Sequence, residues 1–464
     1  MNNLSLTFKQ RVMQYLQQPR YRENIWRATE HALQQRHQAV AEIADWEKLR
    51  LEGHHIKKQV IEHLPRYLNQ FIENARTKGI IVYQASDALA ANQYVEQIAR
   101  QHGVRRIVKS KSMVTEEIGL NAHLQQKGLE IVETDLGEYI VQLAGETPVH
   151  LVGPALHKSR QEIGRLFSEQ LGIAYTAEPS ELTRMARNFL REKFLAADMG
   201  VTGANFGIAD SGRVVVVENE GNARMCMTLP RIRVVIMGME RLIPSERNLP
   251  LFLTLLCRSA TGQRLTGYVS ITGGPGPSPS PEGPENVYYV VVDNGRSRLL
   301  RNSLLKETLY CIRCAACYNI CPVYQTIGGH AYGWVYQGPI GAVMTPELLD
   351  YPNAGDLPFA STLCGACSEI CPVKIPLHRL LLYQRQRIVQ HTKRSATEKY
   401  IVAIFEKLAN HPPLWNRVIG LLGRLQRWLP VEIPIPGWCD SRTFPQVQWP
   451  PFSLWWKKHK NQKT

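Results

Sequence analysis

The spacing of apolar residues divides the chain into a helical start, a segment in which strands alternate with helices, and a helical remainder. Up to about residue 75, apolar side chains recur at helical spacing among Gln, Arg and Glu. Short β-branched runs then predict strands at 79–84, 105–110 and 129–134, with helices at 85–101 and 114–126 between them. This order is typical of βαβ units around a parallel sheet.

The alternation continues less regularly up to residue 295. Further strands are predicted at 149–153, 214–218, 233–238, 267–272 and 287–293, and a further helix at 181–197. After that point the strands stop and short helical pieces carry most of the cysteines. We therefore expect four regions: N-terminal helices at 1–75, an α/β domain at 76–297, a mainly helical cysteine-bearing domain at 298–395, and a C-terminal helical region with a Trp-rich basic tail at 396–464.

Composition narrows the class of protein. Hydrophobic residues make up 44% of the 464 positions and charged residues 20%, which is typical of a globular chain and excludes a disordered one. No apolar run reaches the ~18 residues of a membrane-spanning helix, and the start lacks a signal-peptide core, so a cytoplasmic protein is predicted. The net charge of +15 comes without basic runs interleaved with aromatics, which argues against a nucleic-acid partner.

Seven of the ten cysteines lie between Cys311 and Cys371. The run from Cys311 to Cys321, followed by Pro322, has the spacing C-x₂-C-x₂-C-x₃-C-P of bacterial ferredoxins. Zinc sites more often pair two C-x₂-C knuckles across a long loop. The spacing therefore predicts iron–sulfur clusters.

A second run repeats this pattern with Ser361 in place of its first cysteine. In two-cluster ferredoxins the fourth cysteine of each run ligates the other run's cluster. One [4Fe–4S] cluster would then use Cys311, Cys314, Cys317 and Cys371, and the second would use Cys321, Cys364 and Cys367. The fourth ligand of the second cluster is open: it is Ser361 or another side chain, or it is one of Cys226, Cys257 and Cys439, or the cluster is a [3Fe–4S] with an open corner.

Two clusters in one small domain favour electron transfer over a purely structural role, because each cluster takes one electron. Arg313 and Lys374, which flank the ligand cysteines, would then stabilise the reduced clusters and raise their potentials.

Two polar turns are candidate sites in the α/β region. The strand at 214–218 ends in Glu218-Asn219-Glu220, and the carboxyl ends of parallel strands are where α/β sheets bind ligands. Glu218 and Glu220 are therefore candidates for a nucleophile or base, against the alternative of a plain turn. Lys109 and Lys111 end another strand before a helix and fit either an anion site or a capped helix start. No nucleotide-binding glycine motif follows any of the strands.

In combination, these motifs resemble the lactate-utilisation protein B family, the iron–sulfur subunits of a bacterial L-lactate oxidation system. The resemblance is carried by residues 109–121, 133–150, 202–212, 218–225, 291–297, 311–324, 328–343 and 357–378. It implies a lactate-utilisation (LUD) domain, similar to sugar-isomerase and CoA-transferase folds, followed by a two-cluster ferredoxin-type domain. It also implies two [4Fe–4S] clusters and two sister proteins as partners, a cysteine-rich redox protein and a second LUD protein.

The resulting hypothesis is an electron-transfer subunit of a complex that oxidises L-lactate to pyruvate and delivers electrons to an unidentified acceptor. The alternative is a LUD domain that is catalytic in its own right, in acyl or CoA chemistry with Glu218 or Glu220, with structural or regulatory clusters. A third hypothesis is that the tail docks on a membrane surface or a partner through its Trp and Lys residues, which include Trp438, Trp449, Trp455, Trp456, Lys457 and Lys458.

Overall fold

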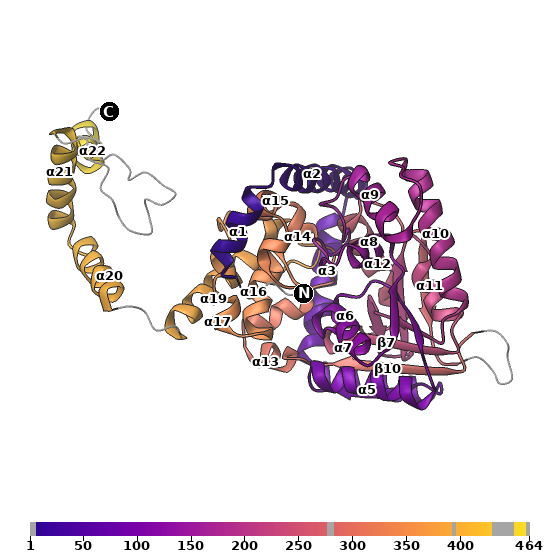
Figure 1. Ribbon diagram of the computed structural model, residues 1–464. Helices are drawn as coiled ribbons and strands as arrows, with labels where there is room; N and C mark the ends of the chain where they lie inside the picture. Colours follow the sequence, from indigo (N-terminus) through magenta and orange to yellow (C-terminus); the bar gives the residue numbers. More distant parts are fainter. Residues whose placement is uncertain (1–5, 276–282, 392–395, 429–449, 461–464) are drawn as a thin grey trace. The chain divides into compact units, whose positions relative to one another are not determined.

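The computed structural model describes residues 6–275, 283–391, 396–428 and 450–460 (Figure 1). The chain divides into two compact units, 1–388 and 389–464. The first unit holds the N-terminal helices, the α/β region and both cysteine runs. The expected boundaries near residues 75 and 297 therefore lie inside one compact body.

A six-stranded parallel sheet forms the centre of the α/β region, with strand order β1-β10-β7-β4-β2-β3. Its strands are β1 (Ile81–Ala85), β10 (Asn286–Val292), β7 (Ile232–Gly238), β4 (Met199–Thr202), β2 (Arg106–Lys109) and β3 (Glu130–Glu133). The associated helices are α5 (Ala88–Gln101), α6 (Met113–Glu117), α7 (Leu120–Gln126), α8 (Leu136–Leu143), α9 (Arg160–Leu171), α10 (Pro179–Leu195), α11 (Asn222–Thr228) and α12 (Leu249–Ala260). The predicted α/β class and parallel sheet are confirmed.

A smaller sheet with strand order β8-β5-β6-β9 packs beside the first. It contains β8 (Leu242–Ile243), β5 (Phe206–Ile208), β6 (Arg213–Glu218) and β9 (Tyr268–Thr272), and β6 runs antiparallel to both β5 and β9. Placing 214–218 in the parallel sheet was therefore wrong. The chain reverses after β5 because Gly212, at φ +65°, donates its N–H to the Ile208 carbonyl and closes a tight turn.

The predicted strand at 149–153 was also wrong. Val149 N–H donates to the Pro154 carbonyl at 2.9 Å, and His150 Nδ1 accepts the N–H groups of Val152 and Gly153. The segment is apolar because it is buried against the cysteine-bearing part, where the Tyr324 hydroxyl donates to the Val149 carbonyl. Sequence periodicity cannot separate this kind of burial from burial within a sheet.

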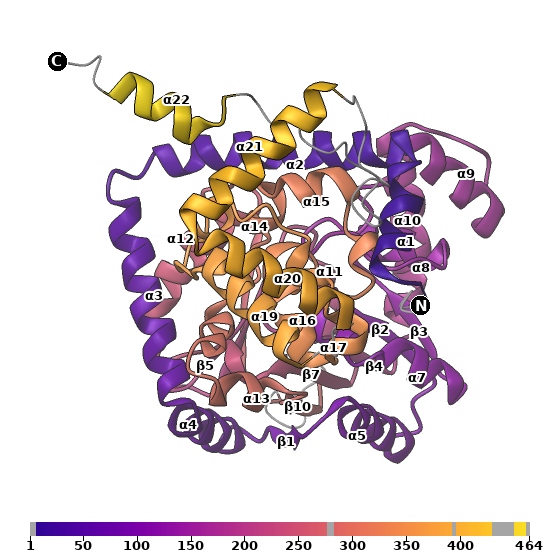
Figure 2. The same cartoon turned by 90° about the vertical axis from the view of Figure 1, so that its left-hand side faces the viewer.

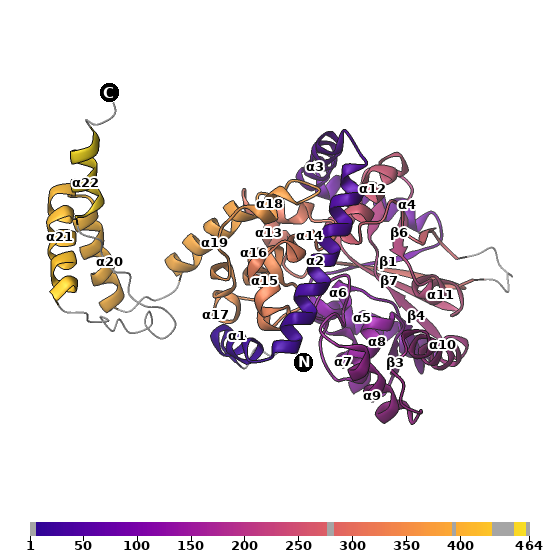
Figure 3. The same cartoon turned by 90° about the horizontal axis from the view of Figure 1, so that it is seen from above.

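Four N-terminal helices lie along the surface of both other parts of the first unit: α1 (Phe8–Leu16), α2 (Pro19–Ala41), α3 (Trp46–Glu62) and α4 (Leu64–Arg76). Figure 2 shows α2 and α3 along two edges of this unit, and Figure 3 shows α2 crossing between the α/β region and the cysteine-bearing helices. Helix α2 contacts α12, α14 and α15. One continuous hydrophobic core consequently joins these helices, the small sheet and the cysteine runs.

The cysteine-bearing part consists of α13 (Arg296–Arg301), α14 (Ala316–Asn319), α15 (Pro322–Ile327), α16 (Gly338–Leu348), α17 (Tyr351–Ala354), α18 (Ala366–Glu369) and α19 (Leu377–His391). Short 3₁₀ turns connect the larger elements: η1 (Met239–Arg241), η2 (Glu246–Asn248), η3 (Leu305–Tyr310), η4 (His330–Tyr332) and η5 (Leu357–Phe359).

The second unit contains α20 (Ala396–Ala409), α21 (Pro412–Trp428) and α22 (Phe452–His459), the last of which carries Trp455 and Trp456. Trp438, Cys439 and Trp449 lie outside the described residues. Among the residues described, none of the helices combines the length and apolar character needed to cross a bilayer.

Candidate iron–sulfur centre and adjoining pocket

The two cysteine runs fold into the same local shape. In each run, the residues immediately before and after one cysteine have positive φ. These are Arg313 (63°) and Ala315 (60°) around Cys314, and Leu363 (55°) and Gly365 (87°) around Cys364. A single helical turn follows, α14 in the first run and α18 in the second. A left-handed non-glycine residue is costly, so its recurrence at matching positions indicates a backbone shaped for a purpose.

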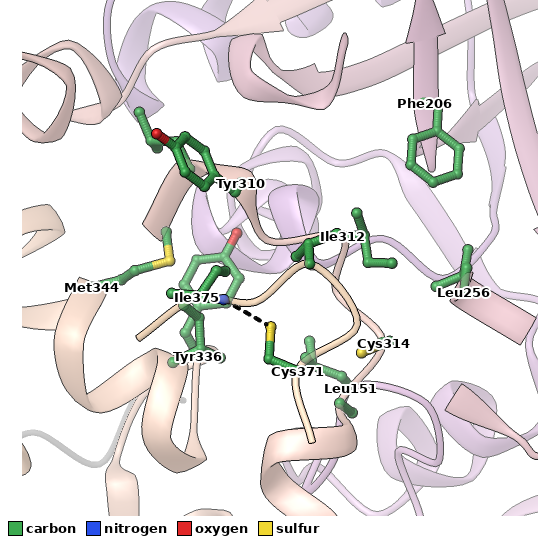
Figure 4. Packing of buried hydrophobic residues seen from close by; sticks show 14 of the residues in the cluster. Leu151, Phe206, Leu256, Tyr310, Ile312, Cys314, Tyr336, Met344, Cys371 and Ile375 are labelled. Atoms are coloured by element: carbon green, nitrogen blue, oxygen red, sulfur yellow. Dashed lines mark hydrogen bonds between the residues drawn. The ribbon is translucent and has the colours of Figure 1, made fainter. Parts of the chain in front are cut away.

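Four cysteines from the two runs line one small cavity: Cys311, Cys314, Cys317 and Cys371. The rest of its wall is apolar and includes Leu151, Ile340 and Val373. Figure 4 shows Leu151 beside Cys314 and Cys371, and marks the hydrogen bond that Cys371 Sγ accepts from the Ile375 amide at 3.4 Å. This set combines three cysteines of the first run with the last cysteine of the second.

The spacing of the sulfur atoms suits a cluster better than a single ion. In the described part of the chain, no three cysteine Sγ atoms lie within 4.8 Å of one another. Tetrahedral zinc, with Zn–S bonds near 2.3 Å, would need its sulfurs about 3.8 Å apart. Four thiolate donors around one apolar cavity fit an iron–sulfur cubane.

Cys321, Cys364 and Cys367 form the second group. Burial raises the pKa of Cys367 to about 12, and the neighbouring Cys321 and Cys364 thiols add to that rise. Cys364 is exposed, whereas the cysteines of the first cavity are buried or half-buried. The second group therefore reaches the surface at Cys364, while Cys321 and Cys367 are buried.

The candidates for the fourth ligand of the second group lie in different parts of the structure. Ser361 lies in the same loop as Cys364, and its Oγ accepts the Leu363 amide at 3.1 Å. Cys226 is buried in the α/β region with its Sγ 3.4 Å from Thr134 Oγ1, and Cys257 lines a separate, larger pocket. Neither of these two thiols joins the second group. Cys439 lies outside the described residues, and Ser361 is the candidate within the group's own loop.

Buried arginines surround the first cavity, and sequence reasoning missed them. Arg50 on α3 donates to the Cys371 carbonyl from Nε at 3.0 Å and Nη2 at 2.8 Å, and Arg36 on α2 donates to the Ile370 carbonyl at 3.0 Å. Lys374 instead pairs with Glu47 at the surface, at 2.8 Å. Positive charge near the first cavity therefore comes largely from helices that are distant in sequence.

A pocket of about 580 Å³ lies between the α/β region and the first cavity. Its wall includes the turns 110–114, 135–137, 151–156, 203–205 and 216–220, the pair 240–241, and the side chains of Arg313 and Tyr336. It thus unites the polar motifs of the α/β region with the loop that carries Cys311 and Cys314. Leu151 lines both this pocket and the cysteine cavity.

Both predicted glutamates line this pocket, in different roles. The carboxylate of Glu218 accepts the amides of Ala223 at 2.7 Å and Arg224 at 2.8 Å, so it caps α11. Glu220 accepts a single amide, that of Leu136, at 3.2 Å. Burial and the nearby Asp135 raise the pKa of Glu220. Of the two, Glu220 keeps more of its carboxylate available for chemistry.

The two predicted lysines are both neutralised. Lys109 is fully buried and does not reach the pocket; its Nζ lies 2.8 Å from Glu133 and 3.1 Å from Glu116. Lys111 does line the pocket, but it pairs with Asp135 at 3.1 Å and donates to the Val152 carbonyl. Of the two alternatives for this stretch, the capped helix start fits at Lys109, because Ser112 caps α6 and three carboxylates surround the Lys109 ammonium.

Sequence reasoning also missed Glu240 and Arg241, which sit at the carboxyl end of β7 in the middle of the parallel sheet. Arg241 is 6% exposed, and its Nη1 donates to the Cys311 carbonyl at 3.2 Å. Glu240 lies 2.6 Å from Arg296 and 3.4 Å from Arg313. The strand at 233–238 was predicted, so the rule that ligands bind at strand ends would have found this pair.

Three family models match successive parts of the chain. A family model for the LUD domain matches residues 68–292, one for a 4Fe–4S dicluster domain matches 307–375, and one for the lactate utilisation protein B C-terminal region matches 384–461.

Several curated relatives align over most of their length. Lactate utilization protein B of Bacillus velezensis is 43% identical over 472 residues, covering 98% of each chain. Lactate utilization protein B 1 of Bacillus mycoides is 44% identical over 432 residues, covering 91% of this chain and 89% of its own. A DUF162 family crystal structure from Deinococcus radiodurans covers 49% of this chain and 98% of its own at 12% identity, with a TM-score of 0.28 that is too low for any conclusion.

Proposed function

The chain belongs to the lactate utilisation protein B family, and we propose that it is the iron–sulfur electron-transfer subunit of a complex that oxidises L-lactate to pyruvate. That oxidation releases two electrons and two protons. A bound [4Fe–4S] cluster accepts one electron, so a chain that holds two clusters can receive the pair. The proposal assigns Cys311, Cys314, Cys317 and Cys371 to one cluster and Cys321, Cys364 and Cys367 to the other.

The observation that carries this proposal is the interleaving of the two ligand groups. Cys317 of the first group lies in α14, and Cys321 of the second group follows that helix. Likewise, Cys367 of the second group lies in α18, and Cys371 of the first group follows it. Each pair is four residues apart, about one helical turn. Both clusters would thus be held by the same two short helices, at the small separation that electron transfer between them needs.

The environment of the first group supports a redox role. Arg36 and Arg50 direct their charge at the backbone of the second run. Hydrogen bonds and positive charge near a cluster favour its reduced, more negative state. Exposed Cys364 in the second group fits the side from which electrons leave for a partner.

The proposed partners are the two sister proteins of the lactate-utilisation system, a cysteine-rich redox protein and a second LUD protein, with a further electron acceptor beyond them. A cytoplasmic location and a docking role for the tail with Trp455 and Trp456 stay predictions.

The second candidate function is catalysis by the LUD domain itself, in acyl or CoA chemistry. One observation favours it: Glu220 lines the pocket, and its carboxylate accepts only one hydrogen bond among the described residues, which leaves it available for chemistry. Glu218 is a weaker candidate because two backbone amides occupy its carboxylate.

The proposal is tested with the chain purified without oxygen and mixed with the two sister proteins. Iron and sulfide counts establish loading, and freeze-quench EPR after addition of L-lactate reports reduction. We expect reduced-cluster signals with L-lactate, none with D-lactate, and their loss in Cys314→Ser. Full loading with reduction by dithionite but never by L-lactate would refute the electron-transfer role.

A further inference from the structure

Arg241 is a buried cation that forms no short-range ion pair with any described residue. It is 6% exposed and lines the pocket, yet its guanidinium has one hydrogen bond, to the Cys311 carbonyl, among the described residues. No carboxylate oxygen lies within 4 Å of its guanidinium in the described part of the chain, although Glu240 acts on it at longer range. The guanidinium carbon lies 5.7 Å from the centre of the Phe206 ring. An arginine has five N–H donors, and burying its charge without an anion is costly.

The other cations of the pocket wall are already paired. Lys111 lies 3.1 Å from Asp135, and Arg313 lies 3.4 Å from Glu240 while its guanidinium stacks 4.4 Å from the centre of the Tyr336 ring. An incoming anion would therefore find free donors at Arg241. Because four carboxylates also line the pocket, a singly charged ligand is favoured over a phosphate dianion.

Arg241 lies next to the first cysteine group. Its side chain contacts the carbonyl of Cys311 itself. Leu151 lines both the pocket and the cysteine cavity, so this one side chain borders both spaces. A ligand held at Arg241 would therefore lie in the pocket that Leu151 shares with the cysteine cavity.

We infer that Arg241 binds the carboxylate of a 2-hydroxy monocarboxylic acid in this pocket, beside the first cysteine group. The anion-binding role follows from the unpaired guanidinium, and the 2-hydroxy acid class rests on the proposed function. A volume of about 580 Å³ exceeds the needs of a three-carbon acid, so longer 2-hydroxy acids also fit.

The test is calorimetric titration of the cluster-loaded full chain with oxamate, a redox-inert carboxylate of the size of lactate, and with L-lactate. We expect saturable binding, weakened about tenfold to a hundredfold in Arg241→Gln, as for loss of a hydrogen-bonded charge pair. Arg241→Lys keeps the positive charge but loses the bidentate guanidinium geometry, so its Kd should lie between that of the unmodified chain and that of Arg241→Gln. The matched control is Arg258→Gln, which removes a partly buried arginine that pairs with Glu42 away from the pocket and should leave the Kd unchanged.

Loss of the bond to the Cys311 carbonyl can also disturb cluster loading, so a second variant is needed. Ala260→Phe fills the pocket from the end of α12 without touching a cysteine group, and we expect it to abolish oxamate binding at full iron content. Absence of binding in the unmodified chain, or unchanged affinity in both Arg241→Gln and Ala260→Phe, would overturn the inference.

The two proposals fail in different ways. If oxamate binding depends on Arg241 but L-lactate never reduces the clusters in the three-protein mixture, the binding site stands and the electron-transfer role falls. If L-lactate reduces the clusters equally well in Arg241→Gln and Ala260→Phe, the electron-transfer role stands and lactate binds elsewhere.

Discussion

Ser361 occupies in the second cysteine run the place that Cys311 occupies in the first. The amide two residues further along donates to the side chain in both runs, to Cys311 Sγ at 3.4 Å and to Ser361 Oγ at 3.1 Å. The donor residue has positive φ in both cases. The second run therefore keeps the backbone of a complete four-ligand motif and differs in one side-chain atom.

Because the backbone is already shaped for a ligand there, we expect Ser361→Cys to supply a fourth thiolate to the second cluster. The variant should hold about eight irons, give no oxidised-state [3Fe–4S] EPR signal, and leave the signal of the first cluster unchanged. Ser361→Ala is the matched control, since it removes the oxygen without adding a ligand. An introduced thiol that still reacts fully with an alkylating reagent in the loaded protein would contradict this prediction.

The crossed ligand groups make a second prediction. Cys371→Ser should alter the EPR signal and potential of the first cluster, although Cys371 belongs to the second run, because its thiol lines the cavity of Cys311 and Cys314. Cys321→Ser should in turn alter the second cluster. Redox titration monitored by EPR separates the two effects. If each variant perturbed the cluster of its own run, the assignment would be wrong.

Much of the architecture was predictable from local pattern. The strands β1, β2, β3, β7 and β10 contain β-branched residues, and β7 and β10 are buried almost throughout. The spacing of the cysteines predicted their chemistry. The failures share one cause, which is contact between segments distant in sequence. Central strand β4, which is absent from the predicted strands, has four residues and includes Gly200. A Cβ there would lie 1.8 Å from the Cys226 carbonyl oxygen, so the glycine is needed because α11 packs closely against the strand.

The site was predictable to the same extent. Glu218, Glu220 and Lys111 were found because they follow predicted strands, and all three line the pocket. Arg36 and Arg50 were not, because a lone arginine on an amphipathic helix carries no local signal of the carbonyl it will meet more than 300 residues later. Neither the pocket nor its shared wall at Leu151 exists until those segments pack together.

A third prediction concerns the buried carboxylates around Lys109. Both oxygens of Glu138 are buried without a hydrogen-bond partner in the described structure, and Lys109 Nζ lies 3.9 Å away. Burial and the neighbouring Glu133 raise the pKa of Glu138 well above its usual range. We expect Glu138→Gln to stabilise the protein at pH 7–8, by about 1–3 kcal/mol, because the amide avoids the proton uptake that a carboxyl with a raised folded pKa requires on folding.

The sign of the pH dependence follows from the raised pKa. Below about pH 4, the unfolded pKa of a glutamate, Glu138 is protonated in both states and the variant gains nothing from charge. As the pH rises from there toward the folded pKa, the unmodified protein loses stability relative to Glu138→Gln. Thermal unfolding midpoints at equal iron content measure the difference. Glu133→Gln, which removes the carboxylate 2.8 Å from Lys109, should instead destabilise.

The last prediction separates the two candidate functions at Glu220 and Glu218. If the LUD domain itself catalyses acyl or CoA chemistry, Glu220→Gln should abolish that activity while leaving the clusters intact. Under electron transfer with the substrate at Arg241, we expect L-lactate-driven cluster reduction by the variant to stay within a few-fold of normal.

Glu218→Gln should lower the thermal unfolding midpoint. The Glu218 carboxylate accepts two amides of α11, and loss of such a cap costs about 0.5–2 kcal/mol. If a Glu220→Gln protein kept its full iron content and its oxamate affinity but showed no lactate-driven reduction, Glu220 would take part in lactate oxidation itself, because binding and cluster loading would both have survived the loss of one carboxylate.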